Sequence, residues 1–424
     1  MTIAKTEWRK LPLSLTELCI DTTLRCGQSF RWKKLHDEWH CTLHGRIVSL
    51  KQDPQHLHYR IIWPDPAVPS TSVSSRTGAV PENAELDDSK ALLQNYFNLH
   101  HDLHGLYKQW ADADPNFRKK ASGFMGVRIL NQDAWEALVG FICSSNNNIS
   151  RISQMVHNLC LHYGPYIGTI GDQAFHDFPS PDSLTADGVE AHLRQLGFGY
   201  RARYIAETAR NIAQVRPAGW LQSLRNPDSV AWGSTVKPKQ VEDERPTYKC
   251  AHESLLELCG VGPKVADCVC LMGLGWGEAV PVDTHVWQIA LRDYKFGSKS
   301  KNKTLSKAMY DAVGDHFRNL WGLQAGWAHS VLFTADLKAF ADQLAAQTKE
   351  KADTKPIKSE VMEEAVLTAP PLAPTTIPSK RKRAVKALSP HVKAETIEQD
   401  TSPSATTAIL TAKRRRSQRV MGRK

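Results

Sequence analysis

Apolar and polar residues alternate in the first part of the chain. The segments 39–43 (WHCTL) and 57–61 (LHYRI) each place an apolar residue at every second position. A period of two is typical of a strand with one buried face, because successive side chains point to opposite sides of a sheet. The pattern therefore predicts an antiparallel sheet, within a first domain that spans residues 1–100.

From residue 89 onward the apolar spacing becomes helical. Apolar residues recur three and four positions apart in 92–97, 135–142 and 149–159, which places them on one face of a helix. We interpret these stripes as core positions and assign residues 101–343 to an all-α region. The chain is thus predicted to be an α+β protein in which a sheet domain precedes the helices.

Three polar stretches interrupt or follow these elements. The segment 64–88, rich in Pro, Ser, Ala and acidic residues, is predicted to be a disordered insertion, and 227–248 a surface insertion. Residues 344–424 contain few aromatic residues and are predicted to form a disordered basic tail. Two basic clusters in it, Lys380–Arg383 and Lys413–Arg416, indicate nuclear import or added DNA affinity; the alternative is a solvated tail.

Composition narrows the class of protein. The 424 residues are 41% hydrophobic, which allows two or three domains with cores of their own. No apolar run approaches the roughly eighteen residues of a membrane-spanning helix, and the N-terminus lacks a secretory apolar segment. Nine cysteines without a short-range framework favour thiols in a reducing compartment. We expect a soluble, intracellular protein without membrane contact.

The net charge of +10 is concentrated in the tail, where residues 341–424 hold 17 Lys and Arg against 9 Asp and Glu. The rest of the chain is nearly balanced. This disfavours a wholly basic, DNA-coating protein and favours a few specific basic groups placed along one face.

The segment 256–268 (LELCGVGPKVADC) carries the most specific chemistry. A Gly260-Val-Gly262 turn between two short helical segments exposes backbone amides, and a helix N-terminus there favours a bound phosphate. A P-loop is excluded, because its Gly-Lys pair is followed by Ser or Thr, whereas Pro263 precedes and Val265 follows the lysine here. The turn therefore indicates a grip on the DNA backbone.

Lys264 falls in the first turn of the helix that Pro263 begins. The positive end of a helix weakens the charged form of a lysine unless a carboxylate compensates, and this favours a nucleophilic amine. Taken alone, the local sequence fits a phosphate contact or a solvent-exposed lysine better. Asp283 in VPVDTHVW stands at a second helix start, where it also suits an N-cap.

Seven segments in order give the chain a family resemblance. They are GQSFRW at 27–32, GVRIL from 126, FICSSNNNI from 141, LGFGYRARY from 196, the hairpin at 256–268, VPVDTHVW at 280–287 and AGWAHSVLFTADL from 325. The chain resembles eukaryotic 8-oxoguanine DNA glycosylases of the helix-hairpin-helix superfamily over about residues 8 to 340. The resemblance implies a monomeric, bifunctional glycosylase and β-lyase of base excision repair, which acts on double-stranded DNA holding 8-oxoguanine opposite cytosine.

The resemblance also implies the roles of the reacting groups. Lys264 attacks C1′ of the flipped nucleotide and forms a Schiff base that permits β-elimination, so no cofactor is required. Asp283 supports the developing positive charge and helps take up the lysine proton. The backbone carbonyl of Gly27 accepts the N7 proton that guanine lacks, and Cys268 and Phe333 cover the two faces of the base. Both of these residue types are also common in cores.

His329 stands where a glutamine usually reads the Watson-Crick edge of the base. Histidine cannot present the same amide fork, so base preference becomes sensitive to pH if the ring titrates near neutrality.

The remaining family positions concern the DNA. The resemblance assigns Asn146 to the space left by the flipped base, Arg151 and Arg201 to the opposite cytosine, and Tyr200 to an aromatic wedge. Glycines at 197 and 199 bend the loop from which Tyr200 and Arg201 project. Helix capping by the asparagines and burial of Tyr200 are the structural alternatives.

The resemblance also implies a DNA-backbone contact and a cation site. His285 corresponds to a contact with the DNA backbone, or else it is a buried structural histidine. The carbonyls of Leu256, Leu258 and Val261 correspond to a structural cation site that bridges to phosphate. No iron-sulfur cluster is expected, since no cysteine follows Asp283.

Two other functions are consistent with the motifs: a superfamily glycosylase for a different damaged base, and a non-catalytic DNA-binding module. Lys264 and the missing cysteine cluster disfavour the first, and the paired Lys264 and Asp283 disfavour the second. We expect a nuclear protein. Mitochondrial import has only a weak signal in Lys5, Arg9 and Lys10 beside Glu7.

Overall fold

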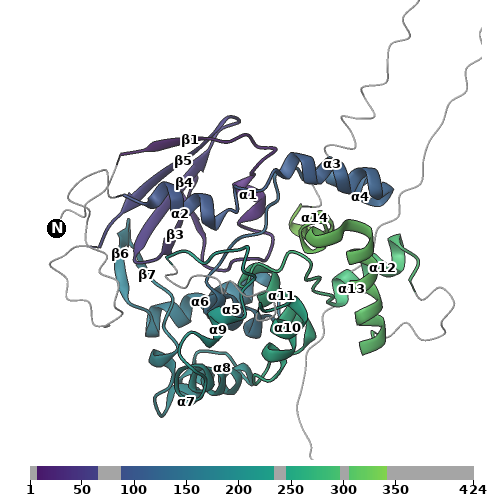
Figure 1. The fold of residues 1–424 in the computed structure, drawn as a ribbon. Coiled ribbons are helices and arrows are strands. Elements are labelled where there is room, and N and C mark those ends of the chain that lie inside the picture. The colour runs from purple at the N-terminus through teal and green to yellow at the C-terminus, as the bar shows by residue number, and fades with distance from the viewer. Residues whose placement is uncertain (1–6, 65–86, 234–244, 297–304, 341–424) are drawn as a thin grey trace, which may run out of the picture. The chain divides into compact units, whose positions relative to one another are not determined.

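The computed structural model describes residues 7–64, 87–233, 245–296 and 305–340 (Figure 1). The predicted insertion at 64–88 lies outside these ranges except for residues 64, 87 and 88, and that at 227–248 lies outside them only at 234–244. The predicted tail at 344–424 lies wholly outside them. Among the described helices, none is both long and apolar enough to cross a membrane.

The predicted antiparallel sheet is present. Its five strands run in the order β1-β5-β4-β3-β2, with residue pairs such as Cys41 opposite Val48 and Leu50 opposite Tyr59. The strand bounds are β1 Arg9–Pro12, β2 Lys33–Leu35, β3 Glu38–Leu43, β4 Arg46–Gln52 and β5 His56–Ile62.

Both faces of this sheet are covered, whereas the alternating pattern predicts one. The odd-numbered residues of β3 pack with α2 (Ser89–Tyr96) in one apolar cluster. A hairpin of β6 (Tyr166–Ile170) and β7 (Gln173–His176) packs on the other face through Ile167 and Phe175. Consequently the polar residues His40 and Thr42 are also buried. The hairpin lies inside the region predicted to be all-α, so that assignment was wrong for this segment.

Besides α2, the described part of the chain contains further α-helices. They are α1 Ile20–Thr23, α3 Leu103–Ala113, α4 Pro115–Ala121, α5 Ala134–Ser144, α6 Ile149–Tyr163, α7 Val189–Gln195, α8 Arg201–Arg210, α9 Trp220–Ser223, α10 Tyr248–Leu256, α11 Pro263–Met272, α12 Thr284–Asp293, α13 Lys307–Trp321 and α14 Ala325–Asp336.

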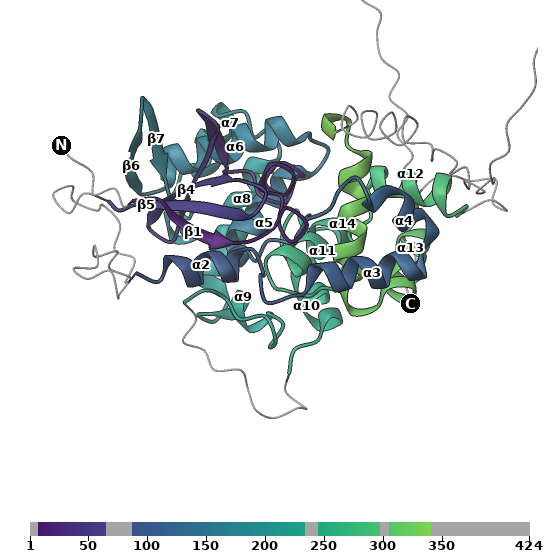
Figure 2. The same cartoon turned by 90° about the horizontal axis from the view of Figure 1, so that it is seen from above.

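Helix α5 forms the centre of the largest core. Its residues 134–143 are buried except for Glu136, which confirms the helical stripe read from 135–142, and α5 packs along α11. Figures 1 and 2 show α5 and α11 between the sheet with α6–α8 on one side and α3, α4 and α12–α14 on the other. Elements from both sides can therefore contribute side chains to a site at α11.

The GQSFRW segment passes close to α5. A Cβ atom added to Gly140 would lie 3.3 Å from the ring of Phe30, so a glycine permits the close approach. The ring of Phe30 meets Phe141 edge to face, with centroids 5.7 Å apart. This contact joins the segment that precedes β2 to the central helix.

Candidate active site and DNA-binding surface

Lys264 is the second residue of α11, after Pro263 at the first position. Its ammonium group donates a hydrogen bond to Ser144 Oγ at 3.1 Å and lies 5.3 Å from the centre of the Phe141 ring. Both partners belong to α5, so the amine is directed across the helix pair into the protein. Lys264 is therefore not a lysine that points freely into solvent, which was one of the alternatives.

Asp283 is the N-cap of α12, as the sequence predicts. Its Oδ1 accepts hydrogen bonds from the backbone amides of His285 and Val286, both at 2.9 Å. Its Oδ2 accepts none from the described residues. One carboxylate oxygen therefore serves the helix and the other is available to a reacting group.

One cavity unites the candidates for catalysis and base recognition. Gly27, Lys264, Cys268, Asp283, His329 and Phe333 all line it. The other lining residues are Cys26, Gln28, Phe141, Met272, Pro281, Val286, Ser330 and Thr334. The lining comes from five stretches of the chain, so these six residues converge only through tertiary folding.

Gly27 adopts a left-handed backbone conformation, with φ of +84°. An added Cβ would lie 3.1 Å from the side chain of Ile149. The next residue, Gln28, is buried and fixes the segment: its amide donates to Arg128 O at 2.8 Å and accepts from Leu130 N at 3.0 Å. The position of the Gly27 carbonyl is thus set by a glycine conformation and a buried amide clamp.

Cys268 and Phe333 approach the cavity from different helices. Cys268 lies one turn after Lys264 on α11 and is 3% exposed. Burial raises the pKa of its thiol to about 11, despite the opposing charge of Lys264. It is therefore a neutral, polarisable wall at physiological pH. Phe333 lies one turn after His329 on α14 and is partly exposed to the cavity.

His329 is buried, and neither ring nitrogen has a hydrogen-bond partner among the described residues. Burial lowers its pKa to about 4, because a charged imidazole loses its hydration there. The idea that the ring titrates near neutrality is therefore wrong for the free protein. Two unpartnered nitrogens in a cavity are costly unless a ligand pairs with them.

The three asparagines of the α5–α6 loop have different hydrogen-bonding roles. Asn148 caps α6 by accepting from Arg151 N at 3.0 Å, and Asn147 donates to Cys143 O at 2.9 Å. Asn146 is exposed, has φ of +47° and makes no side-chain hydrogen bond to the described residues. The capping alternative thus applies to its neighbours, and Asn146 remains open to the outside.

Arg201 and Tyr200 hold this loop from α8. The Arg201 guanidinium donates to the carbonyls of Ser145 and Asn146 and is 3% exposed. The sequence pattern predicts that Arg201 projects outward, but in the structure its side chain is buried against the loop. Tyr200 is 45% exposed, although its hydroxyl donates to Ser145 O at 3.0 Å, so burial of this ring is excluded. Arg151 is exposed, and no hydrogen bond or ion pair engages its side chain in the described chain.

The hairpin between α10 and α11 forms the predicted turn. Gly260 has φ of +79°, and any Cβ would collide with the Tyr204 ring, about 2.5 Å away. At Gly262 the corresponding space is open. The amides of Gly262, Lys264 and Val265 find no acceptor within the described ranges. They are available to an anion at this helix start.

The other two predicted contacts are placed as follows. His285 is partly exposed, and its Nε2 lies 3.2 Å from Asp336 Oδ2. The carbonyl of Leu258 accepts from Val261 N at 3.2 Å, while no such bond to the carbonyls of Leu256 and Val261 occurs within the described residues. The cation site at these three carbonyls stays a prediction.

Sequence reasoning missed a buried carboxylate behind the site. Asp267, next to Cys268 on α11, accepts hydrogen bonds from the hydroxyls of Tyr248, at 2.5 Å, and Tyr310. The hydroxyl of Tyr310 also accepts a hydrogen bond from the backbone amide of Val282 at 3.4 Å. Val282 is the residue immediately before Asp283. This network ties α11 to the segment that carries Asp283. The tyrosines lie 19 and 43 residues from Asp267, so no local spacing could have indicated it. The same holds for Ser144, which is 120 residues from Lys264.

Sequence comparisons agree with this geometry. Residues 10–138 match the family described as 8-oxoguanine DNA glycosylase, N-terminal domain. Residues 139–312 match the HhH-GPD superfamily of base excision DNA repair proteins. The chain is 38% identical over 351 residues to the N-glycosylase/DNA lyase of Saccharomyces cerevisiae, covering 77% of this chain and 86% of that one. It is also 38% identical to N-glycosylase/DNA lyase OGG1 of Arabidopsis thaliana, with 78% and 81% covered.

Solved structures share the fold. An 8-oxoguanine glycosylase/lyase from Clostridium acetobutylicum has a TM-score of 0.59 at 22% identity, covering 79% of this chain and 99% of that one. The MBOgg1 structure with a low-affinity DNA ligand has the same TM-score at 24% identity, with 79% and 98% covered. From these matches and the cavity around Lys264, the chain belongs to the 8-oxoguanine DNA glycosylase family of the HhH-GPD superfamily.

Proposed function

We propose that this chain excises 8-oxoguanine opposite cytosine from double-stranded DNA and then cleaves the strand as a β-lyase. The observation that carries this proposal is the single cavity that holds Lys264, Asp283 and the backbone of Gly27. An amine beside a carboxylate supplies a nucleophile and a proton acceptor, which a DNA-binding module does not need.

The reaction begins with the amine of Lys264. In its neutral form the nitrogen lone pair attacks C1′ of the flipped nucleotide, and the bond from C1′ to N9 breaks as the base leaves with its electron pair. Asp283 stabilises the positive charge that develops on the sugar and accepts the lysine proton through Oδ2. Ser144, which accepts from the ammonium at 3.1 Å, keeps Lys264 directed at the cavity.

Strand cleavage follows from the same nitrogen. Opening of the sugar ring gives a Schiff base between Lys264 and C1′. The imine makes the C2′ proton acidic, and its loss expels the 3′ phosphate. An amine nucleophile therefore accounts for glycosylase and lyase activity without a cofactor.

Base selection uses a fixed acceptor and an unusual side chain. The carbonyl of Gly27 accepts the N7 proton of 8-oxoguanine, and a buried acceptor left unpaired by guanine costs about 1 to 3 kcal/mol. Cys268 and Phe333 cover the faces of the base. The neutral ring of His329 offers one donor and one acceptor to the Watson-Crick edge, which replaces the usual amide fork with a different pairing.

The DNA is held outside the cavity. Asn146 enters the space of the flipped base, Tyr200 wedges the stack, and Arg151 reads the opposite cytosine. Arg201 lies behind the Asn146 loop and contributes to cytosine recognition from there, through its hydrogen bonds to the loop carbonyls.

The strand backbone lies elsewhere on the same surface. The amides at Gly262 and Lys264 bind a phosphate, Gly260 allows the close turn, and His285 contacts the backbone. A cation at the carbonyls of Leu256, Leu258 and Val261 bridges to that phosphate. The enzyme acts as a monomer in the nucleus.

Borohydride trapping tests the proposal. Full-length protein is incubated with duplexes holding one 8-oxoguanine opposite each of the four bases, and the Schiff base is reduced to a stable adduct. We expect an adduct strongest opposite cytosine and absent in Lys264→Gln, with Lys249→Gln, an exposed lysine on α10, as the matched control. Adducts only on another lesion would indicate a different glycosylase, and no adduct with DNA binding intact would indicate a binding module.

A further inference from the structure

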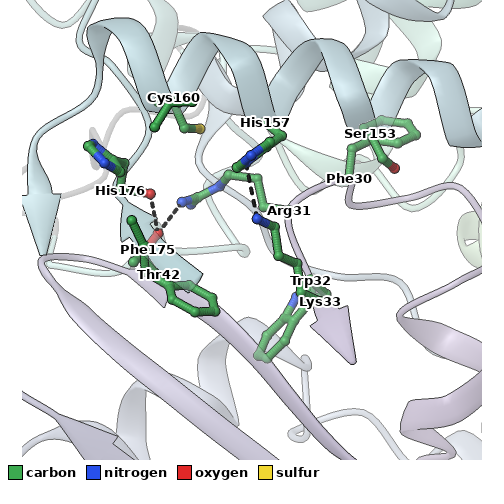
Figure 3. A pocket seen from close by; sticks show the side chains of 12 residues that line it. Phe30, Arg31, Trp32, Lys33, Thr42, Ser153, His157, Cys160, Phe175 and His176 are labelled. Carbon is green, nitrogen blue, oxygen red and sulfur yellow. Dashed lines mark hydrogen bonds between the residues drawn. The ribbon is translucent and has the colours of Figure 1, made fainter. Parts of the chain in front are cut away.

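A second cavity lies on the other side of the GQSFRW segment from the one around Lys264. Gly27 and Gln28 line the Lys264 cavity, whereas Phe30, Arg31, Trp32 and Lys33 line the second. Helix α6 and the β6–β7 hairpin complete its walls through Ser153, His157, Cys160, Leu161, Ala174, Phe175 and His176, together with Thr42 of β3 (Figure 3). Its volume is about 90 Å³, against about 50 Å³ for the Lys264 cavity. This is room for several water molecules or one small ion.

The ammonium group of Lys33 lies among the residues that line this cavity. Its Nζ lies 3.1 Å from His157 Nδ1 and 5.7 Å from the centre of the Phe175 ring. No carboxylate pairs with Lys33 among the described residues, and burial lowers its pKa. Lys34, the next residue of β2, points to the opposite face and pairs with Asp21 at 2.9 Å. Of these two adjacent lysines, the exposed one has a carboxylate partner, and the one in the cavity has none among the described residues.

The groups around Lys33 add donors and positive charge. An ammonium can only donate, so His157 Nδ1 accepts and its Nε2 carries the proton. Ser153, one turn earlier on α6, makes no hydrogen bond through its hydroxyl within the described part of the chain. The charged groups that act on His157 are Lys33, His176 and His162, all basic, and they keep its pKa low together with burial, the largest cause.

Arg31 does not compete for a ligand. Its guanidinium forms ion pairs with Glu136 at 2.6 Å and Asp177 at 3.2 Å and donates to Thr42 Oγ1 at 2.6 Å. Figure 3 shows it near Thr42 and His176, while Lys33 reaches toward His157 on α6. The Arg31 guanidinium is therefore engaged, and Lys33 is the cavity-lining cation without a carboxylate partner among the described residues.

We propose that this cavity is a binding site for a small, free oxyanion of the phosphate type, held by Lys33 Nζ, Ser153 Oγ and the Nε2–H of His157. An oxyanion supplies the missing counter-charge and accepts from each of these donors. A metal cation is disfavoured by the ammonium, and by Cys160, whose pKa burial raises to about 12 so that it stays a thiol.

A phosphate of the DNA backbone is a less suitable occupant. Ser153 and Arg151 are two positions apart on α6, which turns them by about 200° around the helix axis. The cavity therefore faces away from the side chain proposed to read the opposite cytosine. A free anion reaches the site without the DNA.

Isothermal titration of the full-length protein with inorganic phosphate at pH 7 and low salt tests the assignment. We expect one saturable site with a Kd of about 1 mM or tighter. Lys33→Met keeps the apolar stem and removes the charge, so it should weaken binding by about tenfold or more. Lys34→Met is the matched control, and Lys264→Gln tests whether the ammonium of the other cavity binds the anion instead; both should bind within about twofold of wild type.

Three outcomes would overturn the proposal: no saturable binding to wild type, equal affinity in Lys33→Met, or loss of binding in Lys264→Gln alone. Displacement of phosphate by undamaged duplex in wild type and in Lys264→Gln alike would place the site on the DNA surface and contradict a free occupant. If Lys33→Met melts at a lower temperature than Lys34→Met, Ser153→Ala takes its place, with about threefold or greater weakening expected.

Discussion

The cavity around Lys264 and the loop around Asn146 solve different physical problems. In the cavity, burial determines the chemistry: it keeps Cys268 a thiol, keeps His329 neutral and leaves both histidine nitrogens without a partner in the part of the chain that the structure describes. At the loop, the exposed Asn146 has no side-chain bond to the described residues, and the backbone is held from behind by Arg201. A reacting site needs groups removed from water, whereas a DNA-reading surface needs groups that water can still reach.

The largest expected effect separates the two roles of Asp283. Asparagine caps helices about as well as aspartate, so Asp283→Asn should leave the melting temperature nearly unchanged. Loss of the carboxylate charge should slow single-turnover excision of 8-oxoguanine by about 10²- to 10³-fold. A rate close to wild type would show that Asp283 is only a cap.

His329 gives the second effect, on stability rather than rate. Its pKa of about 4 in the folded protein lies below the ordinary 6.5, so the unfolded chain binds more protons between these values. Stability should therefore fall as the pH drops from about 6.5 to 4, by up to about 3 kcal/mol from this residue.

The measurement is urea unfolding of wild type and His329→Gln across that range. The variant should lose less stability on acidification. Excision profiles of the two proteins from pH 6 to 8 should have the same shape, since the ring stays neutral there. A step in the wild-type profile that His329→Gln removes would contradict this.

Arg201→Met tests whether the loop depends on support from behind. Two backbone carbonyls lose a buried donor, which should cost about 1 to 3 kcal/mol of stability. Preference for cytosine opposite the lesion should fall by about tenfold, while trapping through Lys264 persists. Arg203→Met, which removes an exposed ion pair with Glu207, is the control and should change neither quantity. If both variants behave alike, Arg201 does not support the loop.

The smallest effect compares two asparagines of one loop. Asn148→Ala removes the cap of α6 and should cost about 1 kcal/mol in thermal unfolding. Asn146→Gly, which adopts the φ of +47° without strain, should leave stability nearly unchanged and weaken binding to lesion-containing duplex, measured by fluorescence anisotropy. Equal destabilisation by the two substitutions would mean that Asn146 is also structural.

The sequence alone determined the local features of this protein. Pro263 begins α11 and Asp283 caps α12 because these preferences act within one helical turn. Strands β3 and β5 and the stripe on α5 followed from periodicity, and the ordered motifs placed the chain in its family. Each of these signals is carried by residues close together in the chain or by a recognisable segment.

Only the tertiary structure decided how burial and distant partners change those residues. It placed Ser144 on Lys264, buried Arg201, which was expected to project, and covered the second face of the sheet with the β6–β7 hairpin. It also made His329 neutral and left Lys33, but not Lys34, without a carboxylate partner within the described ranges. The pKa and partners of a side chain depend on segments that fold against it from far along the chain, and no local spacing encodes them.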